Sequence, residues 1–447
     1  MALSGSELGL AWATPFAGLL LSIAVMPLAA PAFWHHHFGK IAAGWTLALL
    51  LPFALAFGAA ATGGVLVHTL VEEYLPFTIL LGALYTTAGG IFLRGDLHGS
   101  PALNSGLMLI GAVLASFMGT TGASMLLIRP LIRANDNRRH NAHVVVFFIF
   151  IVSNVGGSLT PLGDPPLFLG FLQGVSFFWT AGHLWGETLF LLVSLLAVFW
   201  AVDAWLYRKE GITPADPTPD APALGVEGVV NLLPLLAAIA LVLLSGTWKP
   251  GVVFDLWGTP LPLQALLRDL GLVAVTAASL WLTPAGVRAK NQFSWAPMQE
   301  VAKLFIAIFL TMVPVIAMLK AGPAGVFAPL AALLTGAGGQ PSTPAYFWLT
   351  GGLSSVLDNA PTYLAFFNLA GGNAETLMNE GAPVLAAISG GAVFMGAMTY
   401  IGNAPNFMVK AIAEERGVKM PSFGAYLLWS GTVLLPLLFV MAWIWMR

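Results

Sequence analysis

The chain contains no cysteine and very little charge. Without cysteine it has neither disulfide bonds nor thiolate metal sites. Only 9% of its 447 residues are charged, against about 25% in soluble domains, so polar side chains are too few to cover a surface in water. The net charge is −2, which gives no basic surface for a nucleic acid. The composition predicts an integral membrane protein whose surroundings are lipid and which has no nucleic-acid partner.

Several motifs of soluble chemistry are also missing. The sequence contains no Walker motif, no Rossmann glycine pattern and no metalloprotease motif, so we expect no ATP-driven transport and no resident cofactor. It contains no Ser/His or paired-Asp motif at catalytic spacing on adjoining helices. We therefore expect a protein that is not an enzyme.

What the chain does contain is apolar runs, since 58% of it is hydrophobic. Runs of about 20 apolar residues span a bilayer as helices, which satisfy their own backbone groups. The sequence predicts an all-α fold with ten transmembrane helices, two of them broken, at 9–30, 41–62, 75–95, 143–176 (broken), 183–206, 229–247, 266–287, 300–321, 383–413 (broken) and 424–446.

Two further apolar stretches, 103–132 and 342–372, are interrupted midway by the polar sequences "GTTGAS" and "DNAPT". Each has about 15 residues before the interruption and about 12 after it, too few for two crossings at 1.5 Å per residue. We predict two re-entrant hairpins, because a non-helical tip at membrane depth must be buried in protein or face water.

These polar segments repeat at one offset. The hairpin tips Gly119 and Asp358 are 358 − 119 = 239 residues apart, and "TPLGDPP" at Thr160 and "TYIGNAP" at Thr399 are 399 − 160 = 239 apart. The shared offset predicts two homologous repeats, 1–210 and 229–447, joined by a cytoplasmic linker at 211–228. Basic clusters such as Arg138–Arg139 and Arg208–Lys209 fall on one predicted side, which makes that side cytoplasmic. The repeats are then inverted, as in secondary transporters of the inner membrane.

Asp164 and Asp358 are the only acidic residues that this placement puts near the middle of the membrane. A carboxylate there costs roughly 3 kcal/mol and is a functional hypothesis by default. A site that holds either a proton or a sodium ion is what an antiporter requires. The alternative is a structural pair, for instance between Asp164 and Arg129.

Neutral oxygen ligands and small residues surround these carboxylates in sequence. Hard cations prefer such oxygens, although each residue alone is also a common helix-packing residue, and the glycines permit the breaks. The predicted ion- and substrate-binding residues are Asp164, Asp358, Asn359, Asn154, Thr160, Thr399, Asn403, Thr120, Thr121, Thr362, Gly163 and Gly402. His35, His36 and His37 are consecutive and cannot face one point, so we expect an interfacial role for them.

The segments "SNVGGSLTPLGDPPLF", "SSVLDNAPTYLAF" and "GAMTYIGNAPNFMVKAIA" resemble those of the ion transporter superfamily. It includes NhaD-type sodium/proton antiporters, arsenite permeases, and citrate and dicarboxylate carriers. The first is similar to the "NxGGxxTxxGDPPN" signature of the arsenite permease branch. The resemblance covers nearly the whole chain and implies a homodimer.

The chain departs from the dicarboxylate carriers at both hairpin tips. Those carriers have Ser-Asn-Thr, whereas this chain has Gly119-Thr120-Thr121 and Asp358-Asn359-Ala360. An acidic tip repels an organic anion, so we predict a sodium/proton antiporter with alternating access. Sodium- or proton-coupled citrate transport stays open, because half-helix N-termini also bind carboxylates. Arsenite transport and an uncoupled channel are weaker alternatives.

Overall fold

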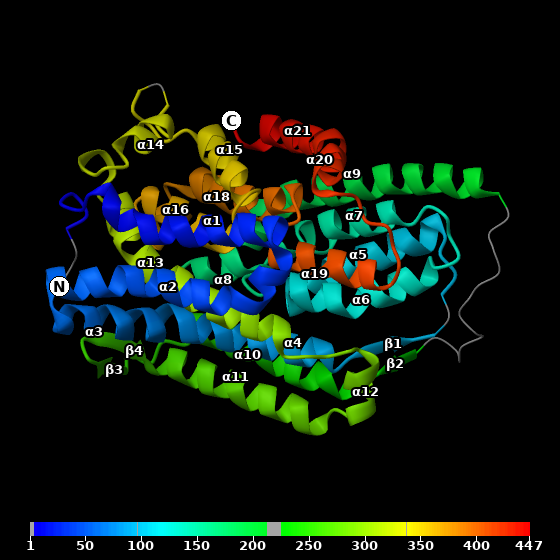
Figure 1. The fold of residues 1–447 in the computed structure, drawn as a ribbon, viewed down its shortest axis with the longest axis horizontal. Coiled ribbons are helices and arrows are strands. Elements are labelled where there is room, and N and C mark those ends of the chain that lie inside the picture. The colour runs from blue at the N-terminus through cyan, green and yellow to red at the C-terminus, as the bar shows by residue number, and fades with distance from the viewer. Residues whose placement is uncertain (1–3, 96, 212–224, 337) are drawn as a thin grey trace.

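The computed structural model describes residues 4–95, 97–211, 225–336 and 338–447, and its elements are mostly helices (Figure 1). Among the described residues, nine helices are long and apolar enough to cross a membrane, and two shorter apolar helices cover 142–157 and 382–398. The prediction of an all-α membrane protein with broken helices is confirmed.

The first part of the chain forms long helices around a helical hairpin and a broken helix. In the labels, η marks a short 3-10 helix, except that η2 and η7 are π-helical. The elements are η1 (Leu10–Ala13), α1 (Thr14–Ala29), α2 (Pro31–Phe57), α3 (Ala59–His68), η2 (Thr69–Tyr74), α4 (Leu75–Gly89), β1 (Phe92–Arg94), α5 (Pro101–Met118), α6 (Thr120–Ala134), α7 (Ala142–Ile151), η3 (Val155–Gly157), α8 (Pro165–Leu172) and α9 (Trp179–Glu210).

The second part of the chain follows the same general order. Its elements are β2 (Gly225–Glu227), η4 (Val229–Asn231), α10 (Leu232–Thr247), β3 (Val253–Leu256), β4 (Thr259–Pro262), α11 (Leu263–Leu282), α12 (Ala285–Lys290), α13 (Ala296–Lys320), η5 (Gly322–Ala324), α14 (Ala328–Leu333), α15 (Thr343–Ser354), α16 (Asn359–Leu369), α17 (Ala374–Met378), α18 (Ala382–Met395), η6 (Gly396–Met398), α19 (Ala404–Glu415), α20 (Phe423–Trp429), η7 (Ser430–Leu434) and α21 (Leu435–Trp445).

Two predicted span boundaries are wrong. The second span begins at Pro31, a residue suited to the first turn of a helix, and it ends before Gly58, whose φ is 86°. The three histidines 35–37 therefore lie inside α2. The third span runs from Ala59 to Gly89 through the π-helical η2, so it begins well before the predicted start at 75 and contains Glu72 and Glu73.

Each predicted hairpin is a pair of packed helices, α5 with α6 and α15 with α16. In Figure 1 the first pair lies in the right half of the molecule and the second pair in the left half. Three arms are short, with 15, 12 and 11 residues. The fourth, α5, has 18 residues and is by itself long enough to span, so the predicted shortness of that arm is wrong.

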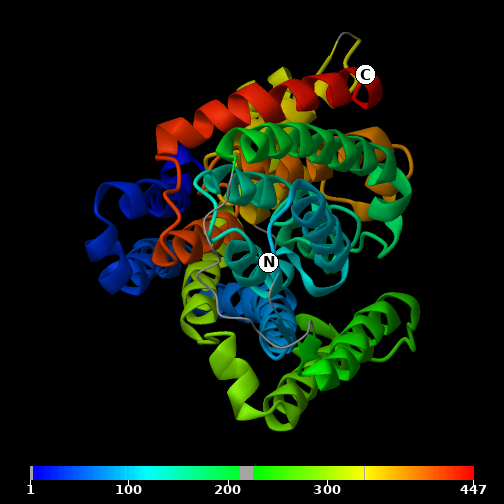
Figure 2. The ribbon, with the colours of Figure 1, turned by 90° about the vertical axis from the view of Figure 1, so that its right-hand side faces the viewer.

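The fold is apolar outside and polar at its centre. Every residue of α7 after Ala142 is buried, and the buried core includes most of α6 and α18. Large apolar side chains on the outer helices are exposed, including Leu55 at 90% and Trp281 at 85%. Figure 2 shows the long outer helices, such as α9 and α11, around the inner ones. This arrangement suits lipid outside and places the breaks in a protein interior.

Two small antiparallel strand pairs are the sheets of the described residues, β1 with β2 and β3 with β4. The first pair joins the chain after α4 to the chain before α10, with Leu93 opposite Val226. Lys290 donates to Glu227 at 2.7 Å beside this pair. Most of the predicted linker, residues 212–224, lies outside the described residues.

Candidate ion and substrate site

Four helices begin at positions that match in pairs. The second arms of the hairpins, α6 and α16, begin at Thr120 and Asn359, and 359 − 120 = 239. The second pieces of the broken helices, α8 and α19, begin at Pro165 and Ala404, and 404 − 165 = 239. The sequence offset is therefore also an offset between helix starts.

The residues just before α8 and α19 have the same backbone shape. Asp164 has φ −136° and ψ 142°, and Asn403 has φ −151° and ψ 136°. Both residues are extended, and each caps a helix that has a proline among its first two positions. Proline at these positions favours the start of a helix. The chain thus places a carboxylate in one broken helix and an amide at the equivalent position of the other.

Matched hydrogen bonds fasten each broken helix to its own hairpin. The Thr160 hydroxyl donates to the Ser116 carbonyl, and the Thr399 hydroxyl donates to the Ser355 carbonyl at 2.6 Å. These two threonines brace the backbone and do not contact Asp164 through those bonds. Thr362 likewise donates to the carbonyl of Asp358, at 3.0 Å, within its own helix.

The two predicted glycines allow the chain to fold back on itself in each break. A Cβ on Gly163 would lie 2.2 Å from the Gly157 carbonyl oxygen, and one on Gly402 would lie 2.6 Å from the Gly396 oxygen. Neither approach leaves room for a side chain. Gly163 also accepts a hydrogen bond at its carbonyl from the Thr120 backbone N–H, at 2.8 Å, which closes the first break against the hairpin tip.

The Asp164 carboxylate lies at the meeting point of both hairpins and both breaks. It is 1% exposed. Its Oδ1 accepts from the Thr120 hydroxyl at 2.9 Å and from the Asn403 amide at 3.1 Å, and its Oδ2 accepts from the Asn359 amide at 2.5 Å. These donors are the first residues of α6 and α16 and the residue just before α19, so residues far apart in sequence hold one carboxylate.

The charge on Asp164 faces helix N-termini and neutral donors. The helices α6 and α16 begin at partners of Asp164, and α8 and α19 begin directly after Asp164 and after its partner Asn403. The N-terminal end of a helix carries a partial positive charge, which favours an anion. The partners of Asp164 among the described residues include no basic side chain, and the structural pair with Arg129 is absent from them, because Arg129 donates to Gln292 instead.

A layer of asparagines joins the two broken helices beside this carboxylate. Asn403 also donates to the Asn154 side-chain oxygen at 3.1 Å, and Asn154 donates to the Asn406 side-chain oxygen at 2.8 Å. Asn406 in turn donates to the Gly396 carbonyl at 2.8 Å. Sequence analysis missed Asn406, although its position three residues after Asn403, in the first turn of the helix that follows the same break, could have indicated it.

One oxygen in this site has no donor. Asn359 is fully buried, and its Oδ1 has no hydrogen-bond partner among the described residues, while its Nδ2 binds Asp164. A buried polar atom without a partner costs about 1–3 kcal/mol. An amide oxygen beside a carboxylate is the ligand type that alkali cations and protonated groups take.

Asp358 occupies a different position from Asp164. It caps α16, where its Oδ1 accepts from the Ala360 backbone N–H at 3.0 Å, and it is partly exposed. It is close enough to Asp164 to act on it electrostatically, but the hydrogen bonds of the described residues do not join the two. Thr121 also lies at the first tip and has no bond to Asp164 among those residues.

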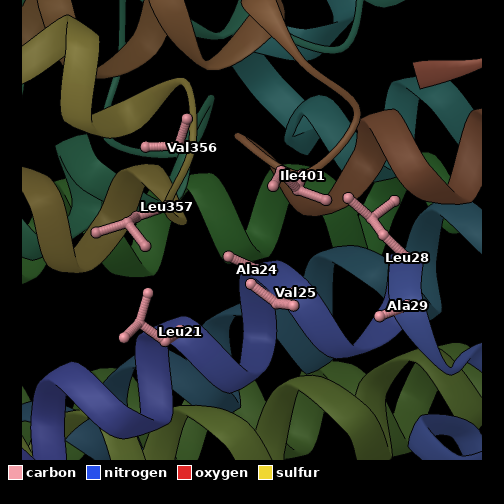
Figure 3. Close-up of a pocket in the computed structure, with 8 residues that line it drawn as sticks. All are labelled: Leu21, Ala24, Val25, Leu28, Ala29, Val356, Leu357 and Ile401. Carbon is pink, nitrogen blue, oxygen red and sulfur yellow. The ribbon is translucent and has the colours of Figure 1, made fainter. Parts of the chain in front are cut away.

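An apolar groove of about 500 Å³ opens next to Asp358 (Figure 3). Figure 3 shows Leu21, Val25 and Leu28 of α1 on one side of this groove, facing Leu357 and Ile401 on the other. The last two residues flank Asp358 and Gly402 in sequence. The groove therefore lies between α1 and the segments that precede Asp358 and Gly402.

The comparison with known protein families agrees with this architecture. No curated protein matches the chain. The family described as "Putative citrate transport" matches residues 5–446, so the match covers both hairpins, both breaks and all residues of the site. The chain belongs to this family of membrane transport proteins.

Proposed function

We propose that the protein is a secondary carrier that couples a citrate-class carboxylate to a cation held by Asp164 and Asn359. The observation that carries the cation site is the Asp164 carboxylate, fully buried among neutral donors with the unpartnered Asn359 oxygen beside it. The family description supports a carboxylate as the transported substrate. The cation is sodium or a proton.

The arrangement explains why coupling would be obligatory. A bare carboxylate inside a low-dielectric protein is costly to move past an apolar barrier. Sodium or a proton on Asp164 neutralises it, and the loaded site can then exchange sides. The N-terminal turn of α6, which has no side-chain cap, supplies backbone N–H groups for the substrate's own carboxylate, as in other anion sites at helix starts.

We further propose that the two sets of elements separated by 239 residues are inverted repeats of an inner-membrane protein. Matched helix starts and matched threonine bonds support a repeat. The opposite placement of the two hairpins in Figure 1 supports the inversion. Rocking of one repeat against the other would give alternating access.

A second candidate is sodium/proton exchange without an organic anion. Asp358 favours it, because an acidic group at the second hairpin tip repels a carboxylate and attracts a cation. In this mechanism sodium and protons compete for Asp164, with Asp358 as a second cation-attracting group near the groove.

Transport in reconstituted vesicles separates the two candidates. Vesicles that contain the protein and a trapped pH dye would be exposed to sodium, lithium, potassium and citrate, alone and in pairs. Citrate uptake that requires an inward sodium or proton gradient supports the carrier. Proton movement driven by sodium alone, with no response to citrate, would instead support the sodium/proton exchanger. The Asp164→Asn protein is the matched control for proton leak.

A further inference from the structure

Arg129 is a buried cation that the proposed transport cycle does not use. It lies on α6 and is 6% exposed. Its Nε donates to the Gln292 side-chain oxygen at 3.2 Å, while its Nη1 is buried without a hydrogen-bond partner among the described residues. A buried guanidinium group normally has its donors paired, because leaving a buried charge unpaired is strongly destabilising.

The surroundings of Arg129 favour an anion. The charged groups that act on it are Arg133, Arg416 and Glu415, two cations against one carboxylate. Its hydrogen-bond partner Gln292 has φ 51°, an uncommon conformation for a residue other than glycine. The loop that follows α12 therefore adopts an unfavourable backbone shape at the residue that holds the guanidinium in place.

The equivalent residue of the second hairpin is also buried and also has a polar atom without a hydrogen-bond partner among the described residues. At the offset of 239, Arg129 corresponds to Asn368 (129 + 239 = 368), and each lies nine residues after the start of its helix. Asn368 is 2% exposed, and its Oδ1 is also without a partner among the described residues. At 1.5 Å per residue both lie about 14 Å from the helix starts at the central site.

Both residues belong to helices that pack on the long helices of their own part of the chain. The helix α6 packs on α4, and α16 packs on α13. The side chain of Lys320, at the end of α13, comes close to Asn368, since a Cβ on Gly372 would lie within 3.0 Å of both. A buried polar position with an unpartnered atom therefore occurs at the same place in the second arm of each hairpin.

We propose that Arg129 is a binding site for a carboxylate group of the transported anion, on its route between the central site and one face of the membrane. This inference rests on the proposed carboxylate substrate. Gln292 orients the guanidinium through Nε, and Nη1 is left to donate to a carboxylate oxygen. Phosphate of an anionic lipid headgroup has the same chemistry, but the burial of Arg129 within the helical body favours a small soluble anion.

The test measures citrate binding and thermal unfolding of the full-length protein in neutral detergent, for wild type, Arg129→Met and Arg129→Lys. Citrate should raise the melting temperature of the wild type. Arg129→Met should weaken citrate binding roughly tenfold to hundredfold, the value of a charge-assisted hydrogen bond. Arg129→Lys should retain part of the affinity, because its ammonium keeps the charge but not the planar fork.

A second measurement separates binding from a structural role. Without citrate, Arg129→Met should unfold at the wild-type temperature or above it, because it removes an unpaired buried charge. Arg288→Met is the matched control: Arg288 donates to the carbonyls of Thr86 and Ser279, so its loss should lower the melting temperature. A comparable decrease for Arg129→Met, with unchanged citrate affinity, would make Arg129 structural and overturn the proposal.

Two further outcomes are also decisive. If an anionic lipid stabilises the wild type but not Arg129→Met, and citrate stabilises neither protein, Arg129 binds a lipid headgroup and the inference is overturned. Wild-type protein that binds no citrate would refute the proposed substrate itself. The inference alone fails if wild type binds citrate and Arg129→Met binds it equally well. In every variant that folds, sodium should still stabilise the protein, because Asp164 is unchanged.

Discussion

Replacing Asp164 with Asn tests the central site with almost no change of shape. The carboxylate accepts three hydrogen bonds, from Thr120, Asn359 and Asn403. The new amide has only one oxygen, so its NH₂ group must face at least one of these donors. One donor then loses its acceptor inside the protein, which costs about 1–3 kcal/mol. We expect a folded protein with a lower melting temperature.

The effect on the cation is larger than the effect on stability. A cation 4 Å from a carboxylate gains about 4 kcal/mol at an effective dielectric constant near 20, which corresponds to roughly a thousandfold in affinity. The Asp164→Asn protein should therefore show no sodium-dependent thermal stabilisation and no gradient-driven uptake at sodium concentrations that saturate the wild type. Both are measurable, in detergent and in vesicles respectively.

Asp358→Asn is the matched control for this experiment. Asn is as good a helix cap as Asp, so the bond to the Ala360 N–H can be kept. Because Asp358 is partly exposed and makes no hydrogen bond to Asp164, its neutralisation should weaken sodium binding less than Asp164→Asn does. An Asp164→Asn protein with an unchanged half-saturating sodium concentration would refute the cation site, and a larger effect of Asp358→Asn would move it to the second hairpin tip.

Two further predictions concern the threonine hydrogen bonds and the glycine contacts that shape the two breaks around the site. Thr160→Val removes one hydroxyl bond between a break and its hairpin and should reduce the free energy of unfolding by about 1 kcal/mol. Thr399→Val should cost more, because its hydroxyl oxygen also accepts from the backbone N–H groups of Ile401 and Gly402; a smaller loss for Thr399→Val in denaturation experiments would contradict this prediction. Gly163→Ala places a Cβ 2.2 Å from the Gly157 oxygen and should prevent a stable fold, whereas Gly352→Ala, with nothing within 4 Å of its Cβ, should melt like the wild type.

The sequence allowed the elements around the site to be predicted because their signals are local. Gly, Pro, Asn and Asp inside an apolar run break a helix wherever it lies, and the positions of both breaks and both hairpin turns were predicted from them. The common offset linked Thr160 with Thr399 and Asp164 with Asn403 without any knowledge of contacts. The role of these residues in binding stays a prediction.

Other features depend on packing that a single sequence does not contain. The predicted span starts at 41 and 75 miss the α2 start at Pro31 and the continuous helix through Glu72 and Glu73, because histidines or carboxylates precede those positions in the sequence. Such side chains are tolerated inside a long helix when it extends beyond the hydrocarbon or turns them toward protein. Asn406 was missed because its hydrogen bond to Asn154 joins residues 252 positions apart.

The pairing of Asp164 with Asn403 has a consequence for the valence of the cation that the proposed function assigns to this site. The two side chains occupy equivalent backbone positions, and the Asn403 amide lies 3.1 Å from an oxygen of Asp164. Two carboxylates at that distance would share one proton or require a divalent metal between them. With an amide on one side, a single positive charge suffices for electroneutrality. The difference of one residue between the two halves thus favours a monovalent ion at the proposed site, and an Asn403→Asp substitution would shift that preference toward a divalent one.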